Sequence, residues 1–122
     1  MAHESENKIV MLELTKGILV GTYLTKFIDL KMAQSTVIDR MKLYGDKDYP
    51  LLIHINNVQH VTKDARDYFA SKEACQKIKS CAIITNSIVT RVIANFFLTL
   101  NKPLVPTKLF TNVEHAKEWL SN

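Results

Sequence analysis

The segment from Ser80 to Leu120 alternates apolar runs with short polar breaks, and this alternation constrains the fold more than any other feature of the chain. The runs have the lengths of a strand, a helix, a second strand and a second helix, at residues 82–84, 88–100, 104–110 and 113–120. Strands joined by single helices are expected to be parallel, with right-handed crossovers. The segment therefore predicts the second half of a small α/β domain.

The helix over residues 88–100 is apolar at positions 88, 89, 92, 93, 96, 97 and 100. This spacing predicts a wide apolar stripe packed firmly against a sheet. Asn101 fits the end of that helix, and Pro103 cannot continue it. Pro106 predicts an edge position for the last strand, because proline cannot donate to a ladder of hydrogen bonds. Thr111 and Glu114 match a capping box at the start of the final helix.

The first half of the chain predicts a hairpin followed by further βα units. Residues 8–14 and 18–24 are two β-rich runs around a turn at residues 15–17. Asp29 is a suitable N-cap for a helix whose apolar stripe is Leu30, Ala33, Val37, Met41 and Tyr44, and Gly45 is expected in the left-handed conformation after it. A buried strand over residues 51–55 and a helix capped by Thr62 follow.

The predicted order is thus ββαβαβαβα, an α/β fold with a mostly parallel mixed sheet. The chain of 122 residues is long enough for one core but not two, so residues 8–122 are expected to form a single domain. Residues 1–7 are expected to be disordered or loosely ordered.

Composition argues against several classes of function. The net charge is +4, but the 16 basic and 12 acidic residues are spread along the chain, so no nucleic-acid surface is predicted. No apolar run approaches the ~20 residues that span a bilayer. The N-terminus is polar and does not resemble a secretory signal, and two cysteines do not make a disulfide framework. We therefore expect a cytoplasmic protein without a transmembrane segment.

Catalysis and cofactor chemistry receive little support from the residues present. Ser87 stands at a strand-to-helix turn but lacks the flanking glycines of a nucleophile elbow. His60 is the only histidine that suggests a base for it, and an enzyme using these two residues is the weakest alternative. The chain has no phosphate-binding glycine motif, and its four histidines are dispersed, so no metal or other cofactor is predicted.

Polar residues collect where the predicted strands end. Parallel α/β sheets bind ligands outside the carboxyl ends of their strands, which makes Asn56, Asn86 and Ser87 candidate ligand-binding residues. Several of the polar residues at these ends are also explained as helix caps, each contributing ~1 kcal/mol and needing no ligand.

The second half of the chain resembles the STAS, or SpoIIAA-like, domain family. The resemblance lies in the residues at positions 81–84, 88–97, 101–103, 108–110 and 116–120. It implies a compact domain with helices packed on the sheet, and regulatory or binding roles in place of catalysis.

The best-known regulatory members of that family carry a phosphorylatable serine at the start of the helix after the third strand. The matching stretch here is residues 61–66, where Asp64 falls at about the position of the serine and Ala65 replaces the glycine of the motif. The phosphoserine switch is therefore not carried over. Asp64 instead supplies a permanent negative charge near a helix N-terminus.

Together, these observations predict a non-enzymatic interaction or regulatory module whose partner is an unidentified protein. The predicted interaction surface is Asn57, His60, Thr62, Asp64 and Arg66. A homodimer is an open alternative, because the opening hairpin could leave an unpaired edge. The alternative function is binding of a small ligand, a nucleotide or an apolar molecule, at the polar strand ends.

Overall fold

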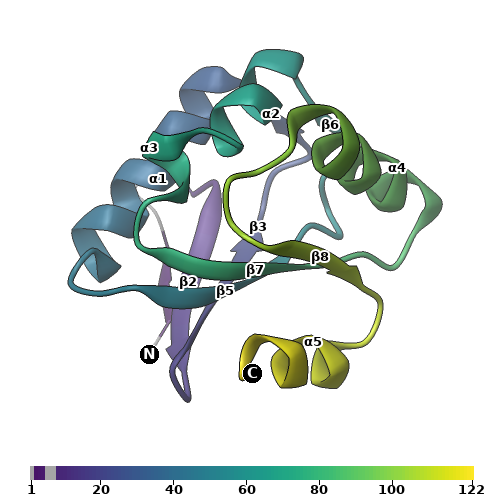
Figure 1. Cartoon of the computed structure of the whole chain (residues 1–122). Helices are drawn as coiled ribbons and strands as arrows, with labels where there is room; N and C mark the ends of the chain where they lie inside the picture. The colour runs from purple at the N-terminus through teal and green to yellow at the C-terminus, as the bar shows by residue number, and fades with distance from the viewer. Residues whose placement is uncertain (1, 5–7) are drawn as a thin grey trace.

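A single twisted sheet of six strands forms the centre of the protein (Figure 1). The computed structural model describes residues 2–4 and 8–122, with side chains from residue 8 onward. The strand order is β1-β2-β3-β5-β7-β8, antiparallel from β1 to β3 and parallel from β3 to β8. The strands are β1 (Ala2–Glu4), β2 (Val10–Thr15), β3 (Ile18–Tyr23), β5 (Tyr49–His54), β7 (Ile78–Ile84) and β8 (Thr107–Phe110). The predicted mixed, mostly parallel sheet is confirmed.

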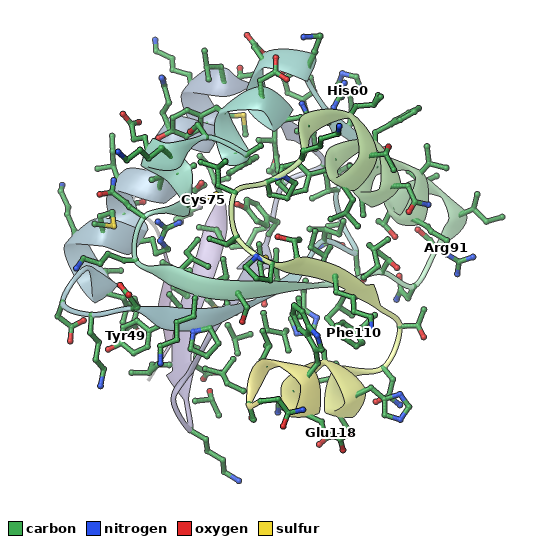
Figure 2. All side chains as sticks on the ribbon, in the orientation of Figure 1. Tyr49, His60, Cys75, Arg91, Phe110 and Glu118 are labelled. Atoms are coloured by element: carbon green, nitrogen blue, oxygen red, sulfur yellow. The ribbon has the colours of Figure 1, made fainter. Side chains whose placement is uncertain are left out.

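Helices cover both faces of this sheet, unequally. Four helices and a π-helical turn lie on one face, and a single helix lies on the other (Figure 1). The first group is α1 (Leu30–Tyr44), α2 (Lys63–Phe69), α3 (Lys72–Cys75), α4 (Ile88–Phe96) and η1 (Phe97–Asn101); the lone helix is α5 (Val113–Leu120). Figure 2 shows Phe110 pointing from β8 towards α5, where its ring lies 5.7 Å from that of Trp119.

Two short strands, β4 (Phe27–Ile28) and β6 (His60–Val61), pair in parallel as a second small sheet that the sequence did not predict. Each is only two residues long, so neither shows the alternation by which a strand is recognised. Their pairing holds the segment before α1 beside the segment before α2.

The predicted opening hairpin is confirmed, and its turn is formed by two residues with positive φ. Lys16 and Gly17 have φ values of 51° and 81°, so both central residues are left-handed. This is the two-residue turn whose twist matches that of the flanking strands. The strand β1 then pairs with β2 on its outer side, so Ala2–Glu4 are in a strand, while residues 1 and 5–7 of the predicted loose N-terminus lie outside the described residues.

Gly45 follows α1 as predicted, but its conformation is not left-handed. Its φ is −85°, and a Cβ atom at this position would collide with the carbonyl oxygen of Met41. The glycine is therefore explained by close approach of the backbone to the preceding turn, and not by a positive φ.

The apolar stripe of α4 is not packed against the sheet as predicted. Ile88, Val92 and Phe96 are exposed by 79%, 46% and 48%, and Leu100 in η1 continues the same row. The side that faces inward is narrower and carries Ala94, Ile93 and Phe97. The helix is apolar on both sides, so its sequence periodicity could not indicate which side packs.

Two predicted helix ends were wrong by one residue. The N-cap of α5 is Asn112, whose Oδ1 accepts a hydrogen bond of 2.9 Å from the His115 amide, so Thr111 and Glu114 do not form the predicted capping box. At the end of η1 the left-handed residue is Lys102, with φ of 51°, and not Asn101. The predicted edge position of the last strand is correct, since β8 is the final strand of the sheet.

Candidate functional site

A cavity of about 130 Å³ lies between the sheet and the helices of its more crowded face. Strands β2, β3, β5 and β7 form its floor, and α1, α2, α3 and the α4–η1 segment form its walls. Most of the lining side chains are aliphatic or aromatic. The polar exceptions include two arginines, Arg40 and Arg66.

Small residues at facing positions create this space. Gly21 lies between Leu19 and Tyr23 on the face of β3 that meets the helices, and it leaves a gap where a side chain would stand. Ala94 on α4 and Ala74 on α3 also line the cavity. Interiors are normally packed with few voids larger than a water molecule. At ~24 cal/mol per Å³, an empty cavity of this size would cost about 3 kcal/mol of stability.

Arg40 is part of the buried wall and has a structural role. Its Nη2 donates to the carbonyl oxygens of Ala74 and Gln76, at 3.1 and 2.8 Å, and so ties α1 to the end of α3. Burial lowers the pKa of Arg40, but a guanidinium remains charged at any physiological pH. The carbonyl groups at the end of α3 compensate this charge.

Two titratable side chains of the cavity floor, Tyr23 on β3 and Cys81 on β7, are held neutral by burial. Burial raises the pKa of the Tyr23 hydroxyl and raises the pKa of the Cys81 thiol to about 12. A thiol with such a pKa supplies almost no thiolate at neutral pH, so Cys81 is a poor nucleophile. The floor of the cavity is therefore apolar and offers no ionised or nucleophilic side chain near pH 7.

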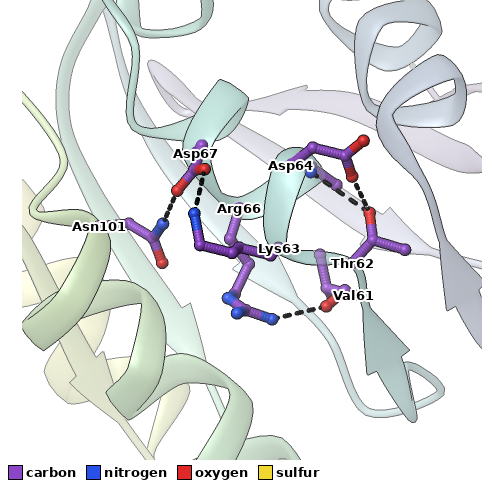
Figure 3. A network of polar contacts seen from close by, with 8 residues as sticks. Val61, Thr62, Lys63, Asp64, Arg66, Asp67 and Asn101 are labelled. Carbon is purple, nitrogen blue, oxygen red and sulfur yellow. Dashed lines mark hydrogen bonds and ion pairs between the residues drawn. The ribbon is translucent and has the colours of Figure 1, made fainter.

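Arg66 lies at the rim of the cavity, on α2, and is half-buried. Its Nη1 donates to the Val61 carbonyl at 2.7 Å, whereas its Nε is buried with no hydrogen-bond partner (Figure 3). The neighbouring carboxylate of Asp67 accepts from Lys63 Nζ at 3.0 Å and from the side-chain amide of Asn101 on η1. This network joins α2 to η1 beside the cavity.

The five residues of the predicted interaction surface do not all lie at the cavity. His60 is exposed on β6 and stacks on the ring of Phe27, with centroids 5.5 Å apart. Thr62 caps α2 by accepting from the Ala65 amide, and its hydroxyl donates to the exposed carboxylate of Asp64. Asn57 is exposed in the loop after β5. Only Arg66 of this set lines the cavity.

The polar strand ends predicted to bind a ligand lie on the surface. Asn56, Asn86 and Ser87 are exposed, and none of them lines the cavity. Ser87 accepts from the Thr90 amide at 3.2 Å and is thus the N-cap of α4. The cavity was missed because its signal is an absence of side-chain volume at Gly21 and Ala94, which no motif records.

The described residues offer no metal site and no membrane-spanning helix. Among residues 8–122, whose side chains the structure describes, no group of three or more His, Cys, Asp or Glu is placed to hold an ion. Within residues 2–4 and 8–122, no helix combines the length and the apolar character needed to cross a bilayer.

The antiparallel hairpin, the parallel strands and the helices on both faces together define a SpoIIAA-like α/β domain. The chain belongs to the DUF7793 family of domains of unknown function, whose model matches residues 12–122. An uncharacterised protein of the DUF3478 family from Shewanella loihica, described as having a SpoIIAA-like fold, is similar in structure. The TM-score is 0.60, with 20% identity over 91% of each chain.

A protein of unknown function from an Arthrobacter species is 30% identical, over 90% of this chain and 97% of that one, with a TM-score of 0.34. No curated protein matches this chain.

Proposed function

We propose that this chain is a non-enzymatic binding module that holds a small apolar molecule in the cavity between its sheet and its helices. The observation that carries the proposal is the apolar cavity of about 130 Å³. An engineered apolar cavity of about 150 Å³ in another protein stays dry and binds benzene or xenon. A ligand with an apolar part of about six carbon atoms is therefore of suitable size.

The chemistry of the cavity floor favours binding over catalysis. The thiol of Cys81 and the hydroxyl of Tyr23 are held neutral by burial, so neither is available as a base or nucleophile near pH 7. Ser87 is engaged as a helix cap. The non-enzymatic character is part of the proposal.

The proposal is tested by titrating benzene and xenon into the full chain, followed by ¹H–¹⁵N NMR. We expect saturable shifts confined to amides around the cavity, including those of Gly21, Phe69 and Ala94. The variant Gly21→Val places a side chain in the cavity and should abolish these shifts. Thr22→Val is the matched control, because residue 22 alternates to the other face of β3 and should leave binding unchanged. Absence of saturable shifts in the wild type would refute the proposal.

A protein-interaction role is the second candidate, and the exposed apolar row on α4 and η1 favours it. Ile88, Val92, Phe96 and Leu100 follow one another at intervals of four residues. Monomeric proteins rarely expose a contiguous apolar row of this kind without an interaction to cover it. The partner that we propose for this face is a second copy of the chain, because two copies related by a twofold axis would each cover the same apolar row of the other.

The two candidates are physically compatible, because α4 takes part in both. Its inner side chains, Ile93 and Ala94, line the cavity, and its outer side chains form the exposed row. A ligand that fills the cavity would therefore contact the same helix that presents the interaction surface.

A further inference from the structure

We infer that the ligand of this cavity carries a carboxylate, and that Arg66 binds it at the rim. The inference rests on the proposed function, because it assumes that the cavity is occupied. It adds the chemical class of the ligand: a small amphipathic acid with an apolar tail in the cavity and its acid group between α2 and η1.

The first support is an unused donor on Arg66. A guanidinium has five N–H groups, and Nη1 uses one of them on the Val61 carbonyl at 2.7 Å. The Nε atom is buried and has no acceptor among the described residues. A buried donor on a charged group is costly to leave unpaired, which makes it an anchor for an oxygen atom that the protein itself does not supply.

The second support is the lack of a carboxylate partner for Arg66 within the described part of the chain. Asp67 is next to it but is engaged by Lys63 Nζ at 3.0 Å and by the amide of Asn101. Asp64 accepts from the Thr62 hydroxyl and is exposed. Lys63–Asp67 is the ion pair formed in this network (Figure 3). The guanidinium of Arg66 is thus available to a carboxylate from a ligand.

The third support is a second unsatisfied atom on the facing element. Asn101 Oδ1 is buried without a partner, and the bond from Asn101 to Asp67 places this residue where η1 meets α2. A ligand carboxylate would accept a hydrogen bond from Arg66 Nε. One water molecule that donates to this carboxylate and to Asn101 Oδ1 would satisfy the second atom. Arg66 lines a cavity whose other residues are mostly apolar, which is the arrangement that an amphipathic acid requires.

Arg40 is a less suitable anchor than Arg66. It lies deeper, with 7% of its surface exposed, and two backbone carbonyls already accept from it. Arg66 is half-buried, so an acid group bound there can remain partly hydrated while the tail is enclosed. The size of the cavity limits the tail to about five or six carbon atoms, in a straight chain or a ring.

The test compares hexanoate with hexan-1-ol, which have similar tails and different heads, by NMR titration of the full chain. We expect hexanoate to bind about tenfold more tightly, because its carboxylate forms charge-assisted hydrogen bonds with the guanidinium as an opposite charge, whereas the alcohol carries no charge. Arg66→Met should remove this difference by weakening hexanoate about tenfold, with hexan-1-ol unchanged. Arg91→Met is the matched control: Arg91 lies on the outside of α4 and points away from the cavity (Figure 2), so both affinities should be retained.

The outcomes separate this inference from the function on which it rests. Equal affinities for hexanoate and hexan-1-ol in the wild type, unaltered by Arg66→Met, would overturn the assignment of an acid ligand and leave the cavity as a binding site. Failure of both probes and of benzene to bind would overturn the proposed function as well. If Arg66→Met does not fold, Arg66→Lys keeps the charge but loses Nε, and an unchanged preference for hexanoate in that variant would contradict the role of this atom.

Discussion

Gly21 is the residue at which the cavity and the stability of the protein are most directly linked. Glycine in a strand is destabilising by roughly 0.5–1 kcal/mol relative to alanine, because it loses more conformational freedom on folding. A Cβ atom at this position would lie 3.5 Å from Leu12 Cδ2 and 3.6 Å from Val10 Cγ2, which is ordinary contact. The structure therefore has room for a methyl group that the sequence does not provide.

We expect Gly21→Ala to raise the free energy of unfolding by about 0.5–1 kcal/mol, measured by urea denaturation. Gly45→Ala is the contrasting variant and should lower it, since a Cβ atom there would collide with the Met41 carbonyl. A destabilised Gly21→Ala protein would show that the space beside β3 is not empty in solution.

His54 is the residue through which we expect the stability of the protein to depend on pH. It is half-buried at the end of β5, and desolvation, with a smaller effect from the charge of Lys117, lowers its pKa in the folded state. In the unfolded chain the pKa is about 6.5. Between the two pKa values, the unfolded state binds more protons at His54 than the folded state does. The contribution of His54 to the free energy of unfolding is therefore fully present above pH ~6.5 and is lost as the pH drops towards the folded pKa.

We expect His54→Gln to flatten this loss of stability below about pH 6.5, measured as the midpoint of thermal unfolding at each pH. His115→Gln, a change on the exposed side of α5, is the control and should retain the slope of the wild type. An unchanged slope in His54→Gln would assign the pH dependence to another group.

At the scale of elements, capping residues were the most predictable features. Asp29 and Thr62 each accept the amide three residues ahead, as their positions before apolar periodic segments indicated. Ser87 does the same at the start of α4, where Asn86 and Ser87 were both possible caps. The start of α5 was wrong because two adjacent residues, Thr111 and Asn112, are both good N-caps. Local sequence could not choose between them, and the path of the chain from β8 decided in favour of Asn112.

The start of α5 gives a direct test of this correction. We expect Asn112→Ala to cost about 1 kcal/mol in the free energy of unfolding, because the His115 amide loses its acceptor. Thr111→Ala should change it by much less, since Asn112 provides the cap. Chemical denaturation of the two variants side by side would distinguish them, and the reverse order of effects would restore the capping box at Thr111 and Glu114.

The α4–η1 segment shows where periodicity fails as a guide. Its apolar positions are those of a buried helix, yet five large apolar side chains on α4 and η1 face solvent: Ile88, Val89, Val92, Phe96 and Leu100. Periodicity records which residues share a side of a helix but not what that side meets. The π-helical turn η1 and the pair β4–β6 are similarly without a sequence signal, because each depends on contacts between distant segments.

At the scale of the whole molecule, the exposed row on α4 and η1 predicts self-association. We expect native mass spectrometry of the wild type at micromolar concentration to show a dimer. The double variant Ile88→Lys with Leu100→Lys should be monomeric with little change in thermal stability, because both side chains are largely exposed, by 79% and 69%.

A matched double variant on α1 provides the control for this prediction. Ile38→Lys with Leu43→Lys also replaces two exposed apolar side chains, which are 54% and 43% exposed, but on a different helix. It should leave the dimer intact. A monomeric wild type, or equal loss of the dimer in both variants, would contradict an interface at α4.

Local sequence accounts for the order of the main strands and helices, the hairpin with its turn at Lys16 and Gly17, most helix caps and the family resemblance. These features depend on neighbouring residues, through backbone conformation, capping hydrogen bonds and apolar periodicity. Only the packed structure shows where the cavity lies, that Arg66 is at its rim, and which side of α4 is exposed. Each depends on how much volume the side chains of separate elements leave between them, and that quantity exists only when β3, α2 and α4 are packed together.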